Sequence, residues 1–206
     1  MKEYITLAPT EYTVEVIIEK SRFIASCIGV TSVDEATAFI AEKRKKYYDA
    51  THNCYAYIVG DKAKFSDDGE PQGTAGLPIM DCIKNNNLDY LCVVVTRYFG
   101  GIKLGAGGLV RAYSGAAAEA LKAATKVQMR LCCSFDVTVD YSMLKTLRKA
   151  MQGVALEKSV DFADKVTVHF LILADLSTTI TDIVLENTLG KAEITVTEPF
   201  ISQYET

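Results

Sequence analysis

The feature that most constrains the fold of this chain is an unbroken apolar run from Leu91 to Thr96. Four of its six residues are β-branched, and a short run of this kind is typical of a strand that is covered on both faces. The run continues directly into Arg97-Tyr98-Phe99-Gly100-Gly101. We therefore predict a buried strand that leads into a glycine-containing loop.

Periodic patterns on both sides of this run predict further strands and helices. Alternating apolar residues from Tyr12 to Glu19, followed by the apolar run Arg22–Val30, indicate a β-hairpin. Ser32 with Glu35 three residues later forms a capping box, which predicts the start of a helix. The other predicted features of the first part are a strand over His52–Val59, a polar turn-forming segment over Gly60–Gly76, and helices over Leu77–Lys84 and Leu109–Ala124.

The second part of the chain has a regular order of strands and helices. The predicted elements are strands over Ser134–Asp140, Ala155–Phe162, Lys165–Ala174 and Ala192–Glu198, and helices over Ser142–Gln152 and Ser177–Leu189. The order βαββαβ is typical of a four-stranded antiparallel sheet with two helices on one face, the ferredoxin-like arrangement. With a boundary near Val127–Cys133, we predict an α+β protein of two domains, residues 1–130 and 131–206.

Composition and charge narrow the classes of protein. The longest strongly apolar runs, Tyr90–Val95 and Phe170–Ala174, are far shorter than the roughly 18 residues of a membrane helix. The N-terminus lacks the apolar core of a secretory signal, so no membrane association and a cytoplasmic location are expected. The net charge is −4, with 19 Lys and Arg against 17 Asp and Glu up to residue 150, and 3 against 9 from Met151 onward. A polyanionic partner should therefore meet the first part.

The cysteines and histidines do not predict a metal centre. The six cysteines lie mostly in apolar stretches without a C-x-x-C pair, which favours buried free thiols. The two histidines, His52 and His169, are far apart in sequence, so no metal and no cofactor are expected. His52 and Cys54 share one face of a predicted strand. Because no third group orients them, structural roles are favoured over catalysis.

Glycines are concentrated around the buried strand. Eight of the 13 glycines lie between Ser66 and Gly108, namely Gly69, Gly73, Gly76, Gly100, Gly101, Gly105, Gly107 and Gly108. Glycine lets backbone N–H groups approach a ligand, and the last three precede a helix whose dipole favours negative charge. Arg97, Lys103 and Arg111 surround this second loop, so a phosphate group is the predicted ligand. The alternative is that the glycines serve only tight turns and packing. The Walker pattern of nucleotide hydrolases is absent.

The first glycine-rich loop is acidic where the second is basic. Its polar residues include Asp67, Asp68, Glu70, Gln72 and Thr74. Three carboxylates within four residues are suited either to hold a divalent cation or to pair with Arg97 and Arg111 and so order the surface. Of these two interpretations, the pairing is favoured.

These loops resemble a known family. Ser66–Gly76 (SDDGEPQGTAG) and Val93–Tyr113 (VVVTRYFGGIKLGAGGLVRAY) resemble the IMPACT (YigZ) family, as do Lys20–Ala25 and His52–Tyr57. The resemblance covers nearly all of the first domain, whereas in the second only the size and the element order agree. It implies a first domain similar to the second domain of a small-subunit ribosomal protein and to domain IV of elongation factor G. The second domain would then be similar to domain V of that factor.

The resemblance points toward RNA and the ribosome. Eukaryotic members of the family regulate translation by interfering with activation of a stress-responsive initiation-factor kinase, and they carry an additional N-terminal RWD domain that contacts partners. This chain starts directly at the first hairpin, as bacterial-type two-domain members do. The resemblance therefore does not imply that this chain makes the partner contact of the RWD domain.

The expected function is that of a non-catalytic, cytoplasmic protein that binds RNA or associates with the ribosome and regulates translation, with a protein partner in translation control as a further expectation. The residues predicted to bind phosphates or bases are Arg97, Lys103, Arg111, Gly100, Gly101, Gly105, Gly107, Gly108, Tyr98, Lys20 and Arg22. Two alternatives stay open. One is an enzyme or sensor that binds a nucleotide or phosphorylated metabolite at the same loop, and the other is a protein-interaction module, favoured by the acidic second domain.

Overall fold

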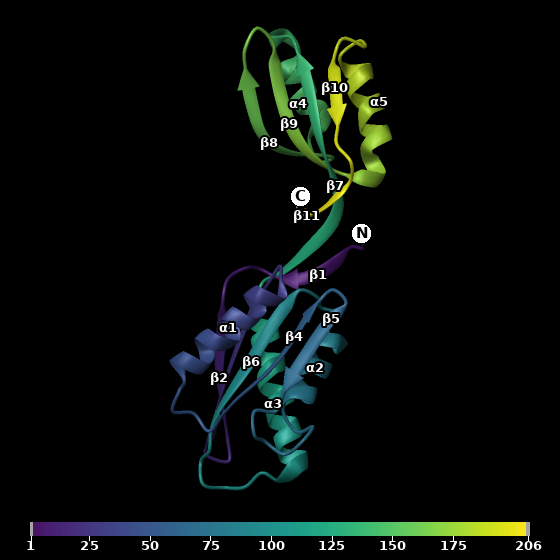
Figure 1. Ribbon diagram of the computed structural model, residues 1–206. Helices are drawn as coiled ribbons and strands as arrows, with labels where there is room; N and C mark the ends of the chain where they lie inside the picture. The colour runs from purple at the N-terminus through teal and green to yellow at the C-terminus, as the bar shows by residue number, and fades with distance from the viewer. Residues whose placement is uncertain (1, 205–206) are drawn as a thin grey trace. The chain divides into compact units, whose positions relative to one another are not determined.

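The computed structural model describes residues 2–204 and divides them into two compact units (Figure 1). The first unit comprises residues 5–127, and the second comprises residues 128–204 together with the first few residues of the chain. Each contains an antiparallel sheet with helices packed against it, so the fold is α+β, as predicted. Within the described residues, no helix is both long and apolar enough to cross a membrane.

The first unit is built on a five-stranded sheet with β6 at its centre. The strands are β2 (Tyr12–Ile18), β3 (Ser21–Gly29), β4 (His52–Val59), β5 (Lys62–Ser66) and β6 (Leu91–Tyr98). Their order is β2-β3-β6-β4-β5, and every neighbouring pair is antiparallel. All residues of β6 before Tyr98 are buried, which confirms the strand that the apolar run predicts.

Helices cover both faces of this sheet (Figure 1). On one face, α1 (Val33–Lys46) packs Phe39 and Ile40 into a cluster with Tyr57 and Val94. On the other face lie α2 (Gly76–Asn85) and α3 (Gly105–Ala123), which close the larger core cluster. Alternate residues of β6 therefore enter two different cores, as the period of a strand requires.

Local sequence signals account for the position of α1. Ser32 is the N-cap residue, and its hydroxyl accepts a hydrogen bond from the N–H of Glu35 at 3.2 Å. In an ideal capping box the Glu35 carboxylate would bind the N–H of Ser32. Here it binds the N–H and the hydroxyl of Thr31 instead, each at 2.7 Å, so the cap extends one residue further back.

The second unit has the predicted βαββαβ order. Its strands are β7 (Lys126–Val139), β8 (Leu156–Phe162), β9 (Val166–Leu173) and β10 (Glu193–Val196), and its helices are α4 (Leu144–Met151) and α5 (Ser177–Asn187). The sheet order β10-β7-β9-β8, with every neighbouring pair antiparallel, is that of the ferredoxin-like arrangement. Two short strands, β1 (Tyr4–Leu7) and β11 (Phe200–Gln203), belong to the same sheet.

The structure differs from the sequence prediction at several elements. The segment Gly60–Gly76, predicted as turns, contains the exposed edge strand β5. Each of the unpredicted strands β1 and β11 is only four residues long, too short for a clear alternation. The helix predicted from Leu109 begins four residues earlier, at Gly105, although glycine has a low helix propensity. The three glycines 105, 107 and 108 therefore belong to the start of α3 and not to a loop before it.

Candidate functional site

The first carboxylate of the acidic loop, Asp67, caps α2 from a distance in the sequence. Its carboxylate accepts hydrogen bonds from the N–H groups of Gly73, Ala75 and Gly76 at 2.8–3.0 Å. The residue in the N-cap position itself, Ala75, makes no side-chain cap. Asp67 thus satisfies backbone donors at the helix start and places a negative charge at the positive end of its dipole.

The next carboxylate, Asp68, connects the acidic loop to β4 and α1 through polar contacts. One oxygen accepts a hydrogen bond from the N–H of Asn53, and the other pairs with Arg44, both at 2.7 Å. The carbonyl oxygen of Asp68 lies 2.7 Å from Nδ1 of His52. Asp67 and Asp68 are therefore engaged by the protein itself.

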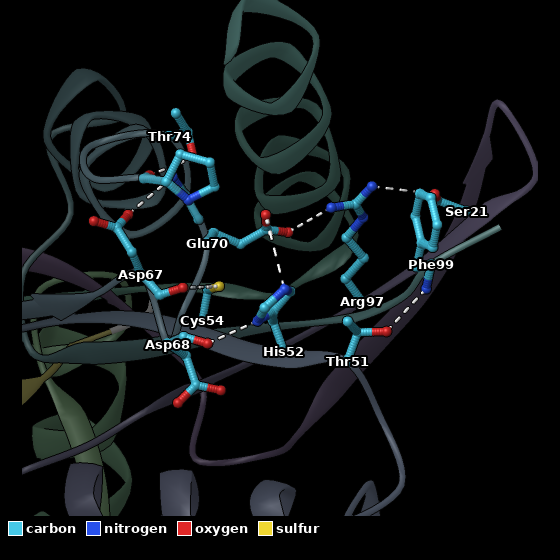
Figure 2. Close-up of polar contacts among 12 residues, drawn as sticks. Ser21, Thr51, His52, Cys54, Asp67, Asp68, Glu70, Thr74, Arg97 and Phe99 are labelled. Carbon is cyan, nitrogen blue, oxygen red and sulfur yellow. Dashed lines mark hydrogen bonds and ion pairs between the residues drawn. The ribbon is translucent and has the colours of Figure 1, made fainter. Parts of the chain in front are cut away.

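The third carboxylate, Glu70, forms a buried ion pair with Arg97 (Figure 2). Its Oε1 accepts from Nη1 of Arg97 at 2.7 Å and from the hydroxyl of Tyr113 at 2.8 Å. The guanidinium lies between the rings of Phe23 and Phe99, 5.5 and 5.4 Å from their centroids. This is one of the pairings that the sequence favours. The other expected partner, Arg111, forms no ion pair with any described residue.

Arg97 is incompletely satisfied. It is only 5% exposed, and its Nη2 makes one long hydrogen bond of 3.4 Å to the hydroxyl of Ser21. Its Nε is the one buried side-chain nitrogen or oxygen of the described residues that has no hydrogen-bond partner. Arg97 therefore lies inside the unit, away from the exposed cations with which the sequence groups it.

The start of α3 differs from that of α2 in having no internal anion. Its N-cap residue, Leu104, provides no side-chain hydrogen bond, and its first turn contains no acidic residue. Lys103 and Arg111 are exposed beside it, and both line a hollow of about 400 Å³ together with Gly108. The first N–H groups of a helix have no partner within the helix, so this end is suited to bind an anion from outside.

The glycines of the basic loop do not all have the same reason to be glycine. A Cβ on Gly100 would lie 2.0 Å from the backbone of Lys20, so close packing requires glycine there. Gly105 has φ +68°, a conformation that side chains other than glycine rarely adopt. Gly107 meets neither condition, since its nearest neighbour would be a guanidinium nitrogen of Arg111 at 3.6 Å. The packing interpretation therefore explains Gly100 and Gly105 but leaves Gly107 without a structural reason.

A cavity of about 320 Å³ lies beside the start of α3 and reaches Arg97. Its lining includes Thr51, His52, Glu70, Pro71, Arg97, Phe99, Lys103, Leu104, Gly105, Ala106 and Leu109. Sequence reasoning missed Thr51, Pro71, Leu104 and Leu109 as parts of a site. The missing information is strand register, which places His52 directly opposite Arg97 on neighbouring strands.

The remaining predicted residues lie around this region in several settings. Lys20 is exposed in the hairpin turn with φ +66°, whereas Arg22 pairs with Glu15 at 2.9 Å and lies over the ring of Tyr98. The hydroxyl of Tyr98 donates to Asp49 at 2.7 Å. Gly101 and Gln72 are exposed, and the hydroxyl of Thr74 donates to the carbonyl oxygen of Pro71 at 2.6 Å. The structure thus brings Lys103, Arg111 and the glycines of α3 together at the surface, whereas Arg97 is buried and shares only the cavity lining with Lys103 and Gly105.

The buried thiol beside this site is not poised for nucleophilic chemistry. Cys54 donates a hydrogen bond to the carbonyl oxygen of Asp67 at 3.0 Å, and burial raises the pKa of its thiol to about 12. Burial likewise raises the pKa of Tyr113, so its hydroxyl stays protonated and donates to Glu70. All six cysteines are free and buried, as predicted. Within the described residues, no group of three or more His, Cys, Asp or Glu side chains could hold a metal ion.

Comparison with known proteins relates most of the chain to one family. Residues 19–121 match the model of the Impact N-terminal domain. The chain is 38% identical to the IMPACT family member YvyE of Bacillus subtilis over 87% of this chain and 85% of that protein. It is also 38% identical to the IMPACT family member YigZ of Escherichia coli, over 62% of this chain and 65% of that protein.

A solved structure supports the same relationship. It is titled as the crystal structure of a hypothetical protein, is 29% identical in sequence, and superimposes with a TM-score of 0.62 over 96% of this chain and 98% of that one. The family model covers β3 through most of α3, which includes both glycine-rich loops. The resemblance seen in these loops is therefore confirmed, and the chain belongs to the IMPACT family.

Proposed function

We propose that this protein binds RNA, alone or on the ribosome, by holding backbone phosphates at the start of α3. The observation that carries the proposal is an uncapped helix N-terminus with two exposed cations beside it, Lys103 and Arg111. Backbone N–H groups and the positive end of the helix dipole bind a phosphate, and the two side chains add charge-assisted hydrogen bonds.

Gly107 supports this assignment independently. It lies in the first turn of a 19-residue helix, where alanine would be the better helix former. Neither space nor backbone conformation requires a glycine at this position. An exposed backbone that a ligand can approach closely accounts for its presence.

Other predicted residues take secondary roles in the proposal. Lys20 extends the cationic surface from the hairpin turn, next to the basic loop at Gly100. Arg22 and Tyr98 form a stacked pair at 5.2 Å that offers a guanidinium and a ring to an unpaired base. Arg97 acts from within, by holding Glu70 and lining the cavity.

The family resemblance adds a biological setting to the proposal, namely regulation of translation in the cytoplasm. Such a role is compatible with RNA contacts and also with a protein partner. From residue 128 onward, where the second unit begins, the chain carries 7 Lys and Arg against 11 Asp and Glu. Its negative charge disfavours RNA binding by the second unit, so RNA binding is assigned to the first unit. The second unit is suited to contact a basic protein surface.

The proposal is tested by measuring RNA affinity as a function of salt concentration. Lys103→Ala and Arg111→Ala should each weaken the binding of single-stranded RNA several-fold and reduce the slope of log affinity against log salt by about 0.7. Lys122→Ala removes an exposed lysine from the last turn of the same helix and serves as a matched control. It should leave both quantities unchanged.

Ribosome co-sedimentation from lysate at low and high salt extends the test to the assembled particle. The Arg97→Ala variant is unsuitable for either experiment, because it would leave Glu70 buried without its cation. If Lys103→Ala and Arg111→Ala bind RNA like the parent protein, the phosphate site is not at the start of α3 and the proposal is wrong.

A further inference from the structure

We propose that the cavity beside α3 binds a single nucleotide whose base carries an exocyclic amino group. Its phosphate would lie on the first turn of α3, and its base would face Glu70 and His52. This inference rests on the proposed function, because both use the same phosphate site. It goes further by naming the ligand's base and by assigning roles to cavity residues that bind no backbone phosphate.

The size and the walls of the cavity suit one flat heterocyclic ring. Its volume of about 320 Å³ is at the small end of the range for small-molecule sites. Pro71, Leu104 and Leu109 supply apolar walls. Phe99 adds an aromatic ring that is 46% exposed and offers a surface for base stacking.

Two hydrogen-bond acceptors face each other in this cavity. The carbonyl oxygen of Asp68 can only accept, so Nδ1 of His52 carries a proton, and in the neutral form of the ring with this tautomer Nε2 is an acceptor. Oε1 of Glu70 is occupied by Arg97 and Tyr113, whereas Oε2 lies 3.9 Å from Nε2 of His52. Two neighbouring acceptors require a ligand that presents donors, and an exocyclic amino group has two N–H bonds.

The incomplete hydrogen bonding of Arg97 is an independent sign of a missing ligand. This cation lines the cavity and is only 5% exposed. Its Nε–H has no hydrogen-bond partner among the described residues. Buried donors are nearly always paired, and an exception calls for an explanation. A polar group of a bound nucleotide would supply the acceptor after a small shift of the guanidinium.

The phosphate end and the base end are linked by the lining itself. Lys103, Gly105 and Ala106 belong both to the start of α3 and to the cavity wall, so one ligand can contact both. The nucleotide has two conceivable sources, a free mononucleotide or the terminal nucleotide of an RNA strand. The chemistry that recognises it is the same, and the experiment below separates the two sources.

The test measures calorimetric binding of the four nucleoside 5′-monophosphates to the full chain. Those of adenosine, cytidine and guanosine carry an exocyclic amino group, and we expect at least one of them to bind ten or more times more tightly than that of uridine. Ala106→Leu fills the cavity mouth from an exposed position and should weaken this binding at least tenfold. Ala118→Leu, at an exposed position further along α3, is the matched control and should bind like the parent.

The outcomes distinguish this inference from the proposed function. If Lys103→Ala weakens RNA binding while no mononucleotide binds and Ala106→Leu has no effect, the nucleotide cavity is wrong and the phosphate surface stands. Equal affinity for all four mononucleotides also overturns the inference. If neither RNA nor mononucleotides bind, both proposals are wrong. Where the amino-bearing nucleotides bind preferentially, short 5′-phosphorylated RNAs that differ only in the terminal base separate the two sources. Preference for the same terminal base identifies a strand terminus, and RNA affinity that is independent of the terminal base identifies a free nucleotide.

Discussion

The starts of α2 and α3 follow two glycine-rich loops of the same unit, yet their electrostatic states are opposite. At α2, the Asp67 carboxylate accepts three backbone hydrogen bonds and occupies the anion position. At α3, Leu104 provides no side-chain hydrogen bond, and the charged side chains that line the adjacent hollow are the cations Lys103 and Arg111 together with Glu19. The backbone N–H groups at the start of α2 are thus satisfied by a carboxylate of the protein, whereas those at the start of α3 are available to an external anion.

This difference indicates that the acidic loop has a structural role, whereas the basic loop is the one available for binding. Glu70 of the acidic loop reaches the end of β6 and neutralises Arg97 there at 2.7 Å, with both side chains largely buried. The acidic loop therefore stabilises the unit and shapes the cavity. The basic loop contributes little internal pairing, and its cations stay available at the surface. Each of the following substitutions breaks or sharpens this division.

The largest effect is expected from the buried ion pair. Glu70→Ala leaves Arg97 without its carboxylate and Tyr113 without its acceptor, so the free energy of unfolding should fall by about 3–5 kcal/mol. Urea denaturation measures this loss. Glu70→Gln keeps an acceptor for Tyr113 and should lose less. A Glu70→Ala variant as stable as the parent would contradict the structural role of the acidic loop.

A smaller loss is expected from the cap of α2. Asp67→Ala removes the acceptor of three backbone N–H groups and should lower the free energy of unfolding by about 2 kcal/mol. Lys103→Ala, at the corresponding end of α3, should change it by no more than about 0.5 kcal/mol. Thermal or urea unfolding of both variants makes the comparison directly. Equal losses would mean that the two helix starts do not differ as described.

A stability effect of opposite sign, smaller than that of Asp67→Ala, is expected at two glycines of α3. Gly107→Ala and Gly115→Ala both replace a helical glycine of α3 that has room for a Cβ, so each should stabilise the protein by up to about 1 kcal/mol. Only Gly107→Ala should also weaken RNA binding, because Gly115 lies away from the start of the helix. If both variants bind RNA equally well, Gly107 is not part of the phosphate site.

Much of the fold was predictable because its signals are local. The β-branched run of β6 indicated a strand buried on both faces, and Ser32 with Glu35 marked the start of α1. The alternation of strand and helix patterns in the second part predicted its βαββαβ order, which the sheet pairing confirms. The start of α3 was misplaced because glycines 105, 107 and 108 have low helix propensity, yet they belong to the helix in the structure.

The details of the site depended on contacts that local patterns do not reveal. Asp67 caps α2 from eight residues before Ala75, a spacing that no capping motif describes. Arg97 is indistinguishable in sequence from an exposed cation, and only the pairing of β4 with β6 places it inside, opposite His52. The pairing of Glu70 with Arg97 was anticipated from charge, whereas the exclusion of Arg111 from such pairing depends on its outward position on α3.

The most direct test of the division between the two helix starts is the response of backbone amides to RNA. In ¹⁵N-labelled protein titrated with a short single-stranded RNA, the amide signals of Gly105, Ala106 and Gly107 should shift in a saturable manner. Those of Gly73 and Gly76, which already donate to Asp67, should stay in place. Equal shifts at both helix starts, or no shift at the start of α3, would contradict the account.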